Sequence, residues 1–277
     1  MELIVFDLDG TLLTRKSRIS PYTRETLRRL TEKGIAYTVA TGRTLHGASD
    51  ILEGHGFELP QIFKNGVMVW NPQYQAYSRH HLLTLDEGKH VSDAFLERKV
   101  TPFIFTLKED SKLAVFHPPL QQKIEYRLVK SFESEGGTPV LPIEQMTADV
   151  RITNVSAVGP ETAITAVATS IDNDEHLVAY MGTAIEDQRL SWIDIHHERG
   201  SKGGAVEALK AELGFSRVIC FGDSENDLTM FESADEAYAP ENAKEHVKAA
   251  ATAVIGHHDS DGIAKFLRER FELLRSL

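Results

Sequence analysis

The chain has 277 residues, 42% of them hydrophobic and 26% charged, which is typical of a globular protein of one large or two ordinary domains. Its formal net charge of -11 argues against nucleic-acid binding and against adhesion to anionic membranes. A single cysteine excludes an internal disulfide. Because the chain opens directly with a strand-like run and has no apolar stretch long enough to span a bilayer, we expect no signal peptide and a cytoplasmic location.

The chain opens with an apolar run, residues 2–6, that predicts a buried strand of a parallel sheet. Asp7 and Asp9 follow this strand, and Gly10 then makes a turn. Side chains two positions apart on an extended backbone point the same way, so we expect both carboxylates on one side, at the edge where open α/β sheets bind ligands. A Mg²⁺ ion would relieve their mutual repulsion, whereas the plainer alternative is an Asp–Gly turn.

Strands and helices alternate through the first third of the chain. Ser20 followed by proline is a typical helix start, and it predicts a helix that runs to residue 33. A strand at 35–40, a helix at 45–53 and a strand at 61–63 come next. This order predicts a parallel, doubly wound sheet.

The pattern changes near residue 78. Adjacent strand-like runs with few helices between them predict an α+β insert with an antiparallel sheet. The expected helices are 85–98, 120–133 and one begun by Pro160, and the expected strands include 102–107, 113–117, 150–158, 177–181 and 190–195. The α/β pattern then resumes, with a helix from about residue 201 to Gly214 and a strand at 217–221. We therefore predict an α/β core with a doubly wound parallel sheet in residues 1–78 and 190–277, and an inserted α+β domain in residues 79–189.

Polar side chains suited to one reaction follow strands or open helices of this pattern: Asp7 and Asp9, Thr41, Lys202, and the group Asp223, Asn226 and Asp227. Because the carboxyl ends of parallel strands meet at one edge of a sheet, we expect these side chains to lie together. Each has a plain structural explanation by itself: a turn for Thr41, a solvated lysine for Lys202, a helix cap for Asp223. Their joint occurrence in this order favours one shared active site.

This order of motifs resembles that of the haloacid dehalogenase superfamily of phosphatases, and more closely its Cof-like group with a large type IIB cap. The matching motifs are Asp7-Leu8-Asp9-Gly10-Thr11, Thr41-Gly42-Arg43, Lys202-Gly203 and Gly222-Asp223-Ser224-Glu225-Asn226-Asp227. The first and last are highly specific together, whereas a lone Lys–Gly gains weight only from its position. The resemblance covers the whole chain and implies that residues 79–189 are the cap. The mannosyl-phosphoglycerate phosphatase branch shares this cap type, but no feature of the sequence selects it.

The resemblance implies a Mg²⁺-dependent phosphatase that hydrolyses a small phosphate monoester, such as a sugar phosphate, through an aspartyl-phosphate. In that family pattern Asp7 is the nucleophile, Asp9 is the general acid and base, and Lys202 is a further catalytic residue. The Mg²⁺ ligands are Asp7, the backbone carbonyl of Asp9, and Asp223. The residues that bind substrate or phosphate are Thr41, Gly42, Arg43, Lys202 and Asn226, while Asp227 supports the metal site or Lys202.

Two further positions keep an alternative open. In the resembling group Arg43 faces the substrate side, so it contacts phosphate or the leaving group; the alternative is a surface ion pair. An Asn–Gly pair at Asn65-Gly66 lies near the substrate entrance in that group; the alternative here is a simple turn.

A phosphomutase of sugar phosphates is the leading alternative function, because it uses the same Asp7 chemistry but returns the phosphoryl group to the sugar. A phospho-receiver domain is much shorter than this chain. A binding module that has lost catalysis would be expected to lose Asp7 or Asp9. We expect a small phosphorylated metabolite as the partner, and neither nucleic acid nor a membrane. The sequence indicates neither the leaving group nor the oligomeric state.

Overall fold

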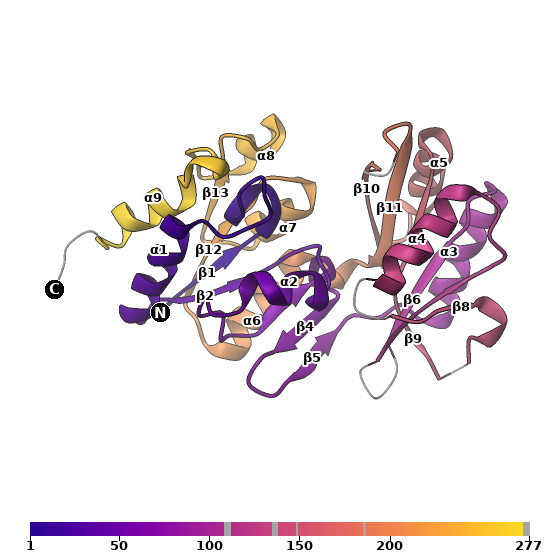
Figure 1. Ribbon diagram of the computed structural model, residues 1–277, viewed down its shortest axis with the longest axis horizontal. Coiled ribbons are helices and arrows are strands. Elements are labelled where there is room, and N and C mark those ends of the chain that lie inside the picture. The colour runs from indigo at the N-terminus through magenta and orange to yellow at the C-terminus, as the bar shows by residue number, and fades with distance from the viewer. Residues whose placement is uncertain (108–111, 135–137, 148, 185–186, 274–277) are drawn as a thin grey trace. The chain divides into compact units, whose positions relative to one another are not determined.

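The computed structural model describes residues 1–107, 112–134, 138–147, 149–184 and 187–273, and only the backbone of residues 78–80. It divides into two compact units (Figure 1): a core unit, Met1–Arg79 with Ser201–Leu277, and an insert unit, His80–Gly200. The second segment of the core unit therefore begins at residue 201, and the predicted domain boundary at residue 190 is wrong. The strand that begins at Leu190 pairs with strands of the insert rather than with the core sheet.

The core unit is built on a parallel sheet with the strand order β14–β13–β12–β1–β2. The bounds of these strands are β1 Glu2–Phe6, β2 Ala36–Val39, β12 Arg217–Phe221, β13 Glu236–Pro240 and β14 Ala253–Ile255. N-terminal and C-terminal segments thus lie side by side in one sheet (Figure 1). This arrangement confirms the predicted α/β fold.

Helices cover both faces of the core sheet because alternate residues of each strand point to opposite sides. Ile4 and Phe6 pack with α1 (Pro21–Glu32), α2 (Leu45–Leu52) and α9 (Gly262–Arg270). Leu3 and Val5 pack with α6 (Lys202–Leu213), α7 (Leu228–Glu232) and α8 (Glu245–Ala250). Cys220 belongs to the second layer, and burial raises the pKa of its thiol above the usual range.

Local signals set the ends of these helices. The Ser20 hydroxyl accepts a hydrogen bond from the backbone N–H of Thr23 at 3.0 Å and so caps α1, with Pro21 at its first position. Helix α6 ends at Gly214, whose φ of 70° is the left-handed conformation that glycine adopts without strain. Both features confirm the expectation from the sequence.

Strand β3 (Gln61–Phe63) differs from its predicted place as a further parallel strand of the core sheet. It forms a separate sheet in the order β3–β4–β5, pairing antiparallel with β4 (Met68–Asn71). The third strand is β5 (Ala76–His80). A parallel bridge between Ala40 and Ile62 connects β3 to the end of β2. The contact of β3 with the core sheet is therefore a single parallel bridge rather than a continuous ladder.

The insert unit is an α+β domain, as predicted. Its sheet has the order β10–β11–β9–β6–β7–β8, and the pairs are antiparallel except for β7 with β8, which are parallel. The bounds are α3 Leu85–Glu97, β6 Phe103–Leu107, β7 Leu113–His117, α4 Lys123–Ser134, β8 Val140–Pro142, β9 Arg151–Pro160, α5 Glu161–Ile171, β10 Leu177–Thr183 and β11 Leu190–His197. Helices α3 and α5 pack on one face, and α4 packs on the other.

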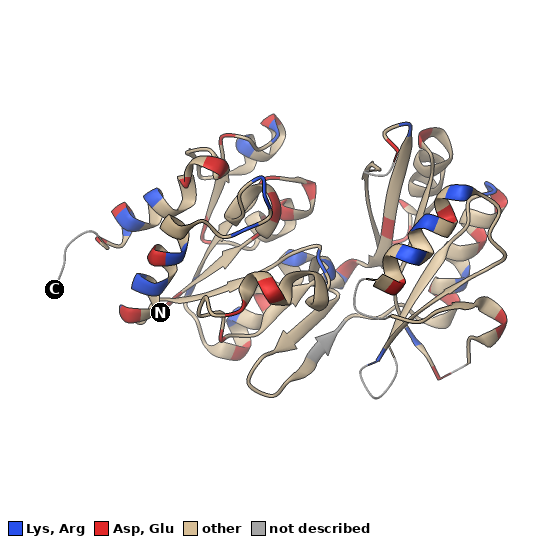
Figure 2. Ribbon diagram, viewed as in Figure 1, with Lys and Arg blue, Asp and Glu red and all other residues tan. Residues whose placement is uncertain are grey.

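Charged residues of both signs lie mainly on the helices and loops of both units (Figure 2). In the part of the chain that the structure describes, no helix combines the length and the apolar character needed to cross a bilayer.

Candidate active site

The candidate site lies at the carboxyl ends of β1 and β12, which are neighbours in the core sheet. After β1 the chain continues to α1 on one face, and after β12 it continues to α7 on the other. Such a reversal leaves a crevice at the strand ends, which is where open α/β sheets bind ligands. Asp7 follows β1 and Asp223 follows β12, so the fold brings together two carboxylates more than two hundred residues apart in sequence.

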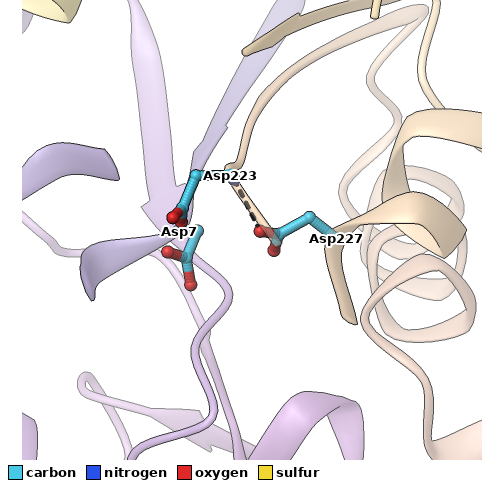
Figure 3. Close-up of side chains that lie close together, drawn as sticks. All are labelled: Asp7, Asp223 and Asp227. Carbon is cyan, nitrogen blue, oxygen red and sulfur yellow. Dashed lines mark hydrogen bonds between the residues drawn. The ribbon is translucent and has the colours of Figure 1, made fainter. Parts of the chain in front are cut away.

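Three carboxylates meet at this point. One oxygen each of Asp7, Asp223 and Asp227 lies within 4.8 Å of the other two, and Figure 3 shows the three side chains converging. Burial raises the pKa of Asp7 well above its usual range, with a lowering effect from Lys202 and further raising effects from Asp227 and Asp223. Burial, with Asp227, also raises the pKa of Asp223, to about 6.

Lys202 supplies the positive charge inside this cluster. Its side chain is fully buried, and its ammonium donates to Asp7 Oδ1 and to Asp227 Oδ1, each at 2.6 Å. Burial lowers the pKa of Lys202, but the carboxylates of Asp227 and Asp7 outweigh this and leave it above its usual range. Lys202 is the first residue of α6, and the Ser201 hydroxyl caps that helix by accepting from Gly204 N–H at 3.1 Å. The helix start therefore fixes where the ammonium points.

Both carboxylate oxygens of Asp227 accept hydrogen bonds. Oδ1 accepts from Lys202, and Oδ2 accepts from the backbone N–H groups of Asp223 at 2.8 Å and Ser224 at 3.0 Å. The bond to Asp223 N–H is the dashed line in Figure 3. Asp227 therefore shapes the loop after β12 and anchors Lys202, while the carboxylates of Asp7 and Asp223 are left to meet a ligand.

The donor set fits a hard divalent cation. When all are ionised, the three carboxylates outnumber the single ammonium and leave an excess of negative charge in a buried setting, which is costly without a counterion. Carboxylate oxygens are the ligands that Mg²⁺ prefers. The oxygens in position are those of Asp7 and Asp223, the latter also accepting from the Thr11 hydroxyl at 3.0 Å.

Asp9 does not join this cluster, although we expected Asp7 and Asp9 to point the same way. That expectation required an extended backbone from Asp7 through Asp9, but β1 ends at Phe6 and Leu8 between them has a helical conformation, although Asp7 and Asp9 themselves are extended. The Asp9 side chain is 54% exposed and pairs with Arg43, whose Nε and Nη2 donate to its two oxygens at 2.6 Å each. Arg43 therefore forms the ion pair that was its alternative, with Asp9 as the partner.

Two residues hold the turn that follows Asp7. A Cβ on Gly10 would stand 2.3 Å from Asp223 Oδ2, so this position has room only for glycine. Asn242 donates to the Gly10 carbonyl at 2.7 Å and accepts from His258 N–H at 3.1 Å. Sequence reasoning missed Asn242, and only its place just after β13, a strand end like the others, could have pointed to it.

Thr41, Gly42 and Asn226 lie in the loops next to the carboxylate cluster. Thr41 is buried, and its hydroxyl oxygen accepts from Arg43 N–H at 3.1 Å, which leaves the hydroxyl proton available to a ligand. A Cβ on Gly42 would stand 3.0 Å from Asn65 Oδ1, and Asn226 donates to that same oxygen at 2.8 Å. Asn65 is buried and lies in the turn Lys64–Gly66, and through the bond from Asn226 it connects the two loops.

Comparisons with known proteins agree with this geometry. The model of the family described as haloacid dehalogenase-like hydrolase matches residues 4–267. The chain is 29% identical to the 5-amino-6-(5-phospho-D-ribitylamino)uracil phosphatase YwtE of Bacillus subtilis, over 96% of this chain and 97% of that protein. It is 26% identical to the pyridoxal phosphate phosphatase YbhA of Escherichia coli, over 96% and 97%. The structure of the subclass IIB sugar phosphatase BT4131 superposes with a TM-score of 0.76 at 22% identity, over 99% and 100% of the two chains.

Proposed function

This chain belongs to the haloacid dehalogenase-like hydrolase family, and from that premise we propose that it is a Mg²⁺-dependent phosphatase of a small phosphate monoester, such as a sugar phosphate. The observation that carries the proposal is the Lys202 ammonium at 2.6 Å from both Asp7 and Asp227, beside Asp223. This arrangement presents a buried carboxylate nucleophile whose environment still lacks positive charge. A phosphoryl group with its metal ion is a ligand of matching chemistry.

Asp7 performs the first displacement. Its carboxylate attacks phosphorus, the bond from phosphorus to the leaving oxygen breaks, and Asp9 gives that oxygen a proton. In the second step Asp9 takes a proton from water, the water oxygen attacks the phosphorus of the aspartyl-phosphate, and Asp7 leaves as a carboxylate with release of inorganic phosphate. Arg43 donates to both oxygens of Asp9, so this pair must open before Asp9 can reach the leaving oxygen.

Other residues hold the transferred group. The hydroxyl of Thr41, the ammonium of Lys202 and the amide of Asn226 are donors for phosphoryl oxygens, and Gly42 lets the loop backbone approach closely. Asp7, Asp223 and the backbone carbonyl of Asp9 would hold Mg²⁺. When bound, this ion supplies the positive charge that lets an anionic nucleophile approach an anionic substrate.

Hydrolysis is favoured over the phosphomutase alternative, since the curated relatives YwtE and YbhA are both named as phosphatases. Their names also support a small phosphorylated metabolite as the substrate class. The net charge of -11 supports a metabolite rather than nucleic acid or a membrane surface as the partner. A cytoplasmic location is part of the proposal, supported by a single buried cysteine.

The test is phosphate release from a panel of phosphate monoesters, with and without Mg²⁺. We expect metal-dependent release that Asp7→Asn lowers by at least about a thousandfold. Asp93→Asn makes the same chemical change at an exposed position of α3 and should leave the rate unaltered. Phosphorus NMR of the products separates free phosphate from an isomerised sugar phosphate, which would indicate the mutase. A folded protein that releases no phosphate and isomerises no ester would overturn the proposal.

A further inference from the structure

The insert unit contains a cavity of about 260 Å³ that the phosphatase chemistry does not use. It opens on the sheet face opposite α3 and α5. Residues of β6, β9 and β11 form its floor, while α4 contributes one wall through Leu128 and Phe132. All of its lining residues belong to the insert unit, so the cavity is a feature of that domain by itself.

The walls are aromatic. Phe132 of α4 makes edge-to-face contacts with Phe103, at 5.4 Å between ring centroids, and with Phe105, at 5.1 Å. Trp192 of β11 stands on the same face and is paired in register with Gly182 of β10. A Cβ at Gly182 would approach the indole to 3.0 Å, so the glycine lets the ring lie against the strand. The cavity thus presents several rings to an incoming group.

One carboxylate lies among these rings. Asp194 is two residues after Trp192 on β11, and it pairs in register with Ser156, which in turn pairs with Phe103. Asp194 Oδ1 accepts from the Asn154 amide at 2.6 Å and from the Ser156 hydroxyl. Both donors are neutral, and no lysine or arginine of the described residues forms a salt bridge with Asp194. A partly buried carboxylate without a cationic partner is favourably placed to pair with a cation.

We propose that this cavity binds a small aromatic ammonium compound: a flat ring that stacks among Trp192, Phe103 and Phe132, with a protonated amine that reaches Asp194. Aromatic faces attract both rings and cations, and the single carboxylate sets the sign of the charge and the end of the cavity at which it lies. A cavity of this size holds one ring with a short side chain. The proposal is independent of the phosphatase reaction, because binding requires no turnover.

The chain offers a direct reporter. It has two tryptophans, and the other one, Trp70, lies in β4 of the core unit, so Trp70→Phe leaves Trp192 as the only emitter. Titration of this full-length variant with 2-phenylethylamine, with excitation of tryptophan alone, should give a saturable change in emission. The uncharged analogue 2-phenylethanol should bind about tenfold more weakly, the effect of losing one charge-assisted contact.

Asp194→Asn in the same background tests the carboxylate. The asparagine oxygen can still accept from Asn154 and Ser156, so the variant removes the charge and keeps the shape. We expect the Kd for 2-phenylethylamine to rise about tenfold and that for 2-phenylethanol to stay constant. Asp93→Asn on α3 is the matched control and should change neither value.

Several results would overturn the proposal: no saturable change, equal affinity for amine and alcohol, or an unchanged Kd in Asp194→Asn. If Asp194→Asn fails to fold, the comparison of amine with alcohol on the parent still tests the charge. Inhibition of p-nitrophenyl phosphate hydrolysis then identifies the source of the ligand. Competitive inhibition assigns the cavity to the non-phosphate part of the substrate, and binding without competition assigns it to a separate effector; both outcomes support the site.

Discussion

Lys202 is the residue on which the electrostatics of the site depend. It neutralises one of three carboxylates directly and holds a second in place, while it is itself fully buried. The same contacts that would prepare Asp7 for attack also hold α6 to the loop after β12. In the proposed mechanism, catalysis and stability are therefore coupled through one ammonium group, and its removal should affect both.

Lys202→Met should abolish phosphatase activity and lower the free energy of unfolding by about 3–5 kcal/mol, because it leaves two buried carboxylates without their counterion. Lys210→Met is the matched control on the same helix, since Lys210 forms a partly exposed pair with Asp235 at 2.9 Å. That variant should cost less than about 1 kcal/mol. Denaturant unfolding of both variants measures the difference; equal costs would show that the buried pair contributes nothing particular.

Under the proposed function, Asp223 would make Mg²⁺ binding dependent on pH. Its pKa in the folded, metal-free protein is raised to about 6, above its value in the unfolded chain. Between about pH 4 and pH 6 the folded state therefore binds more protons than the unfolded state, and its stability falls as the pH rises through this range. Mg²⁺ needs the ionised carboxylate, so the increase in Tm caused by the ion should be larger at pH 7.5 than at pH 5. Equal increases at both values would contradict this assignment.

At the scale of an element, the turn after β1 decides whether the carboxylates can meet. Gly10 and Gly214 have similar positive φ values, 75° and 70°, but different surroundings. A Cβ at Gly10 would collide with Asp223, whereas one at Gly214 would meet nothing within 4 Å. Comparing the two glycines separates two reasons for glycine: the positive φ of the backbone, which both share, and the lack of space beside Asp223, which applies only to Gly10.

Gly10→Ala and Gly214→Ala should each lower the free energy of unfolding by about 1–2 kcal/mol, the cost of a left-handed conformation for a residue with a Cβ. Gly10→Ala alone should also weaken Mg²⁺ binding and lower kcat, because its methyl group displaces Asp223. Calorimetric titration with Mg²⁺ and steady-state kinetics on both variants test this. Similar metal affinity in the two would refute the role assigned to the turn.

The elements that the sequence predicts best are those with local signals. The motifs place Asp7, Lys202 and Asp223 at strand ends and helix starts, and the structure brings them together. The motifs could not predict that Asp9 is the partner of Arg43, because this contact depends on how two turns face each other. The same is true of Asn65 and Asn242, which interact with residues distant in sequence. The sequence predicts residues 190–195 as a strand of the insert, and β11 (Leu190–His197) does pair there, so the error at residue 190 concerns the domain boundary and not the strand.

At the scale of the whole molecule, each unit has hydrophobic clusters of its own. Ile4 and Val5 belong to clusters of the core unit, and Val155 and Ile193 belong to one of the insert unit. A cavity made in one unit should therefore weaken the packing of that unit first.

Val155→Ala should speed amide hydrogen exchange in β9 and β11 and leave β1 and β12 protected, because the lost contacts lie within the insert unit. Val5→Ala, at an equally buried position of the core, should give the reverse pattern. Hydrogen exchange followed by mass spectrometry resolves these segments. Faster exchange throughout the chain in both variants would mean that the two units open together.

The buried thiol of Cys220 can report how often the core sheet opens. The residue lies in β12 between β1 and β13, so a thiol-specific reagent can reach it only when the sheet has opened. The rate of labelling therefore counts opening events in the native protein, without denaturant and without activity. Because β12 leads directly to Asp223, any ion or phosphate analogue that binds there should lower the rate of Cys220 labelling in proportion to its occupancy.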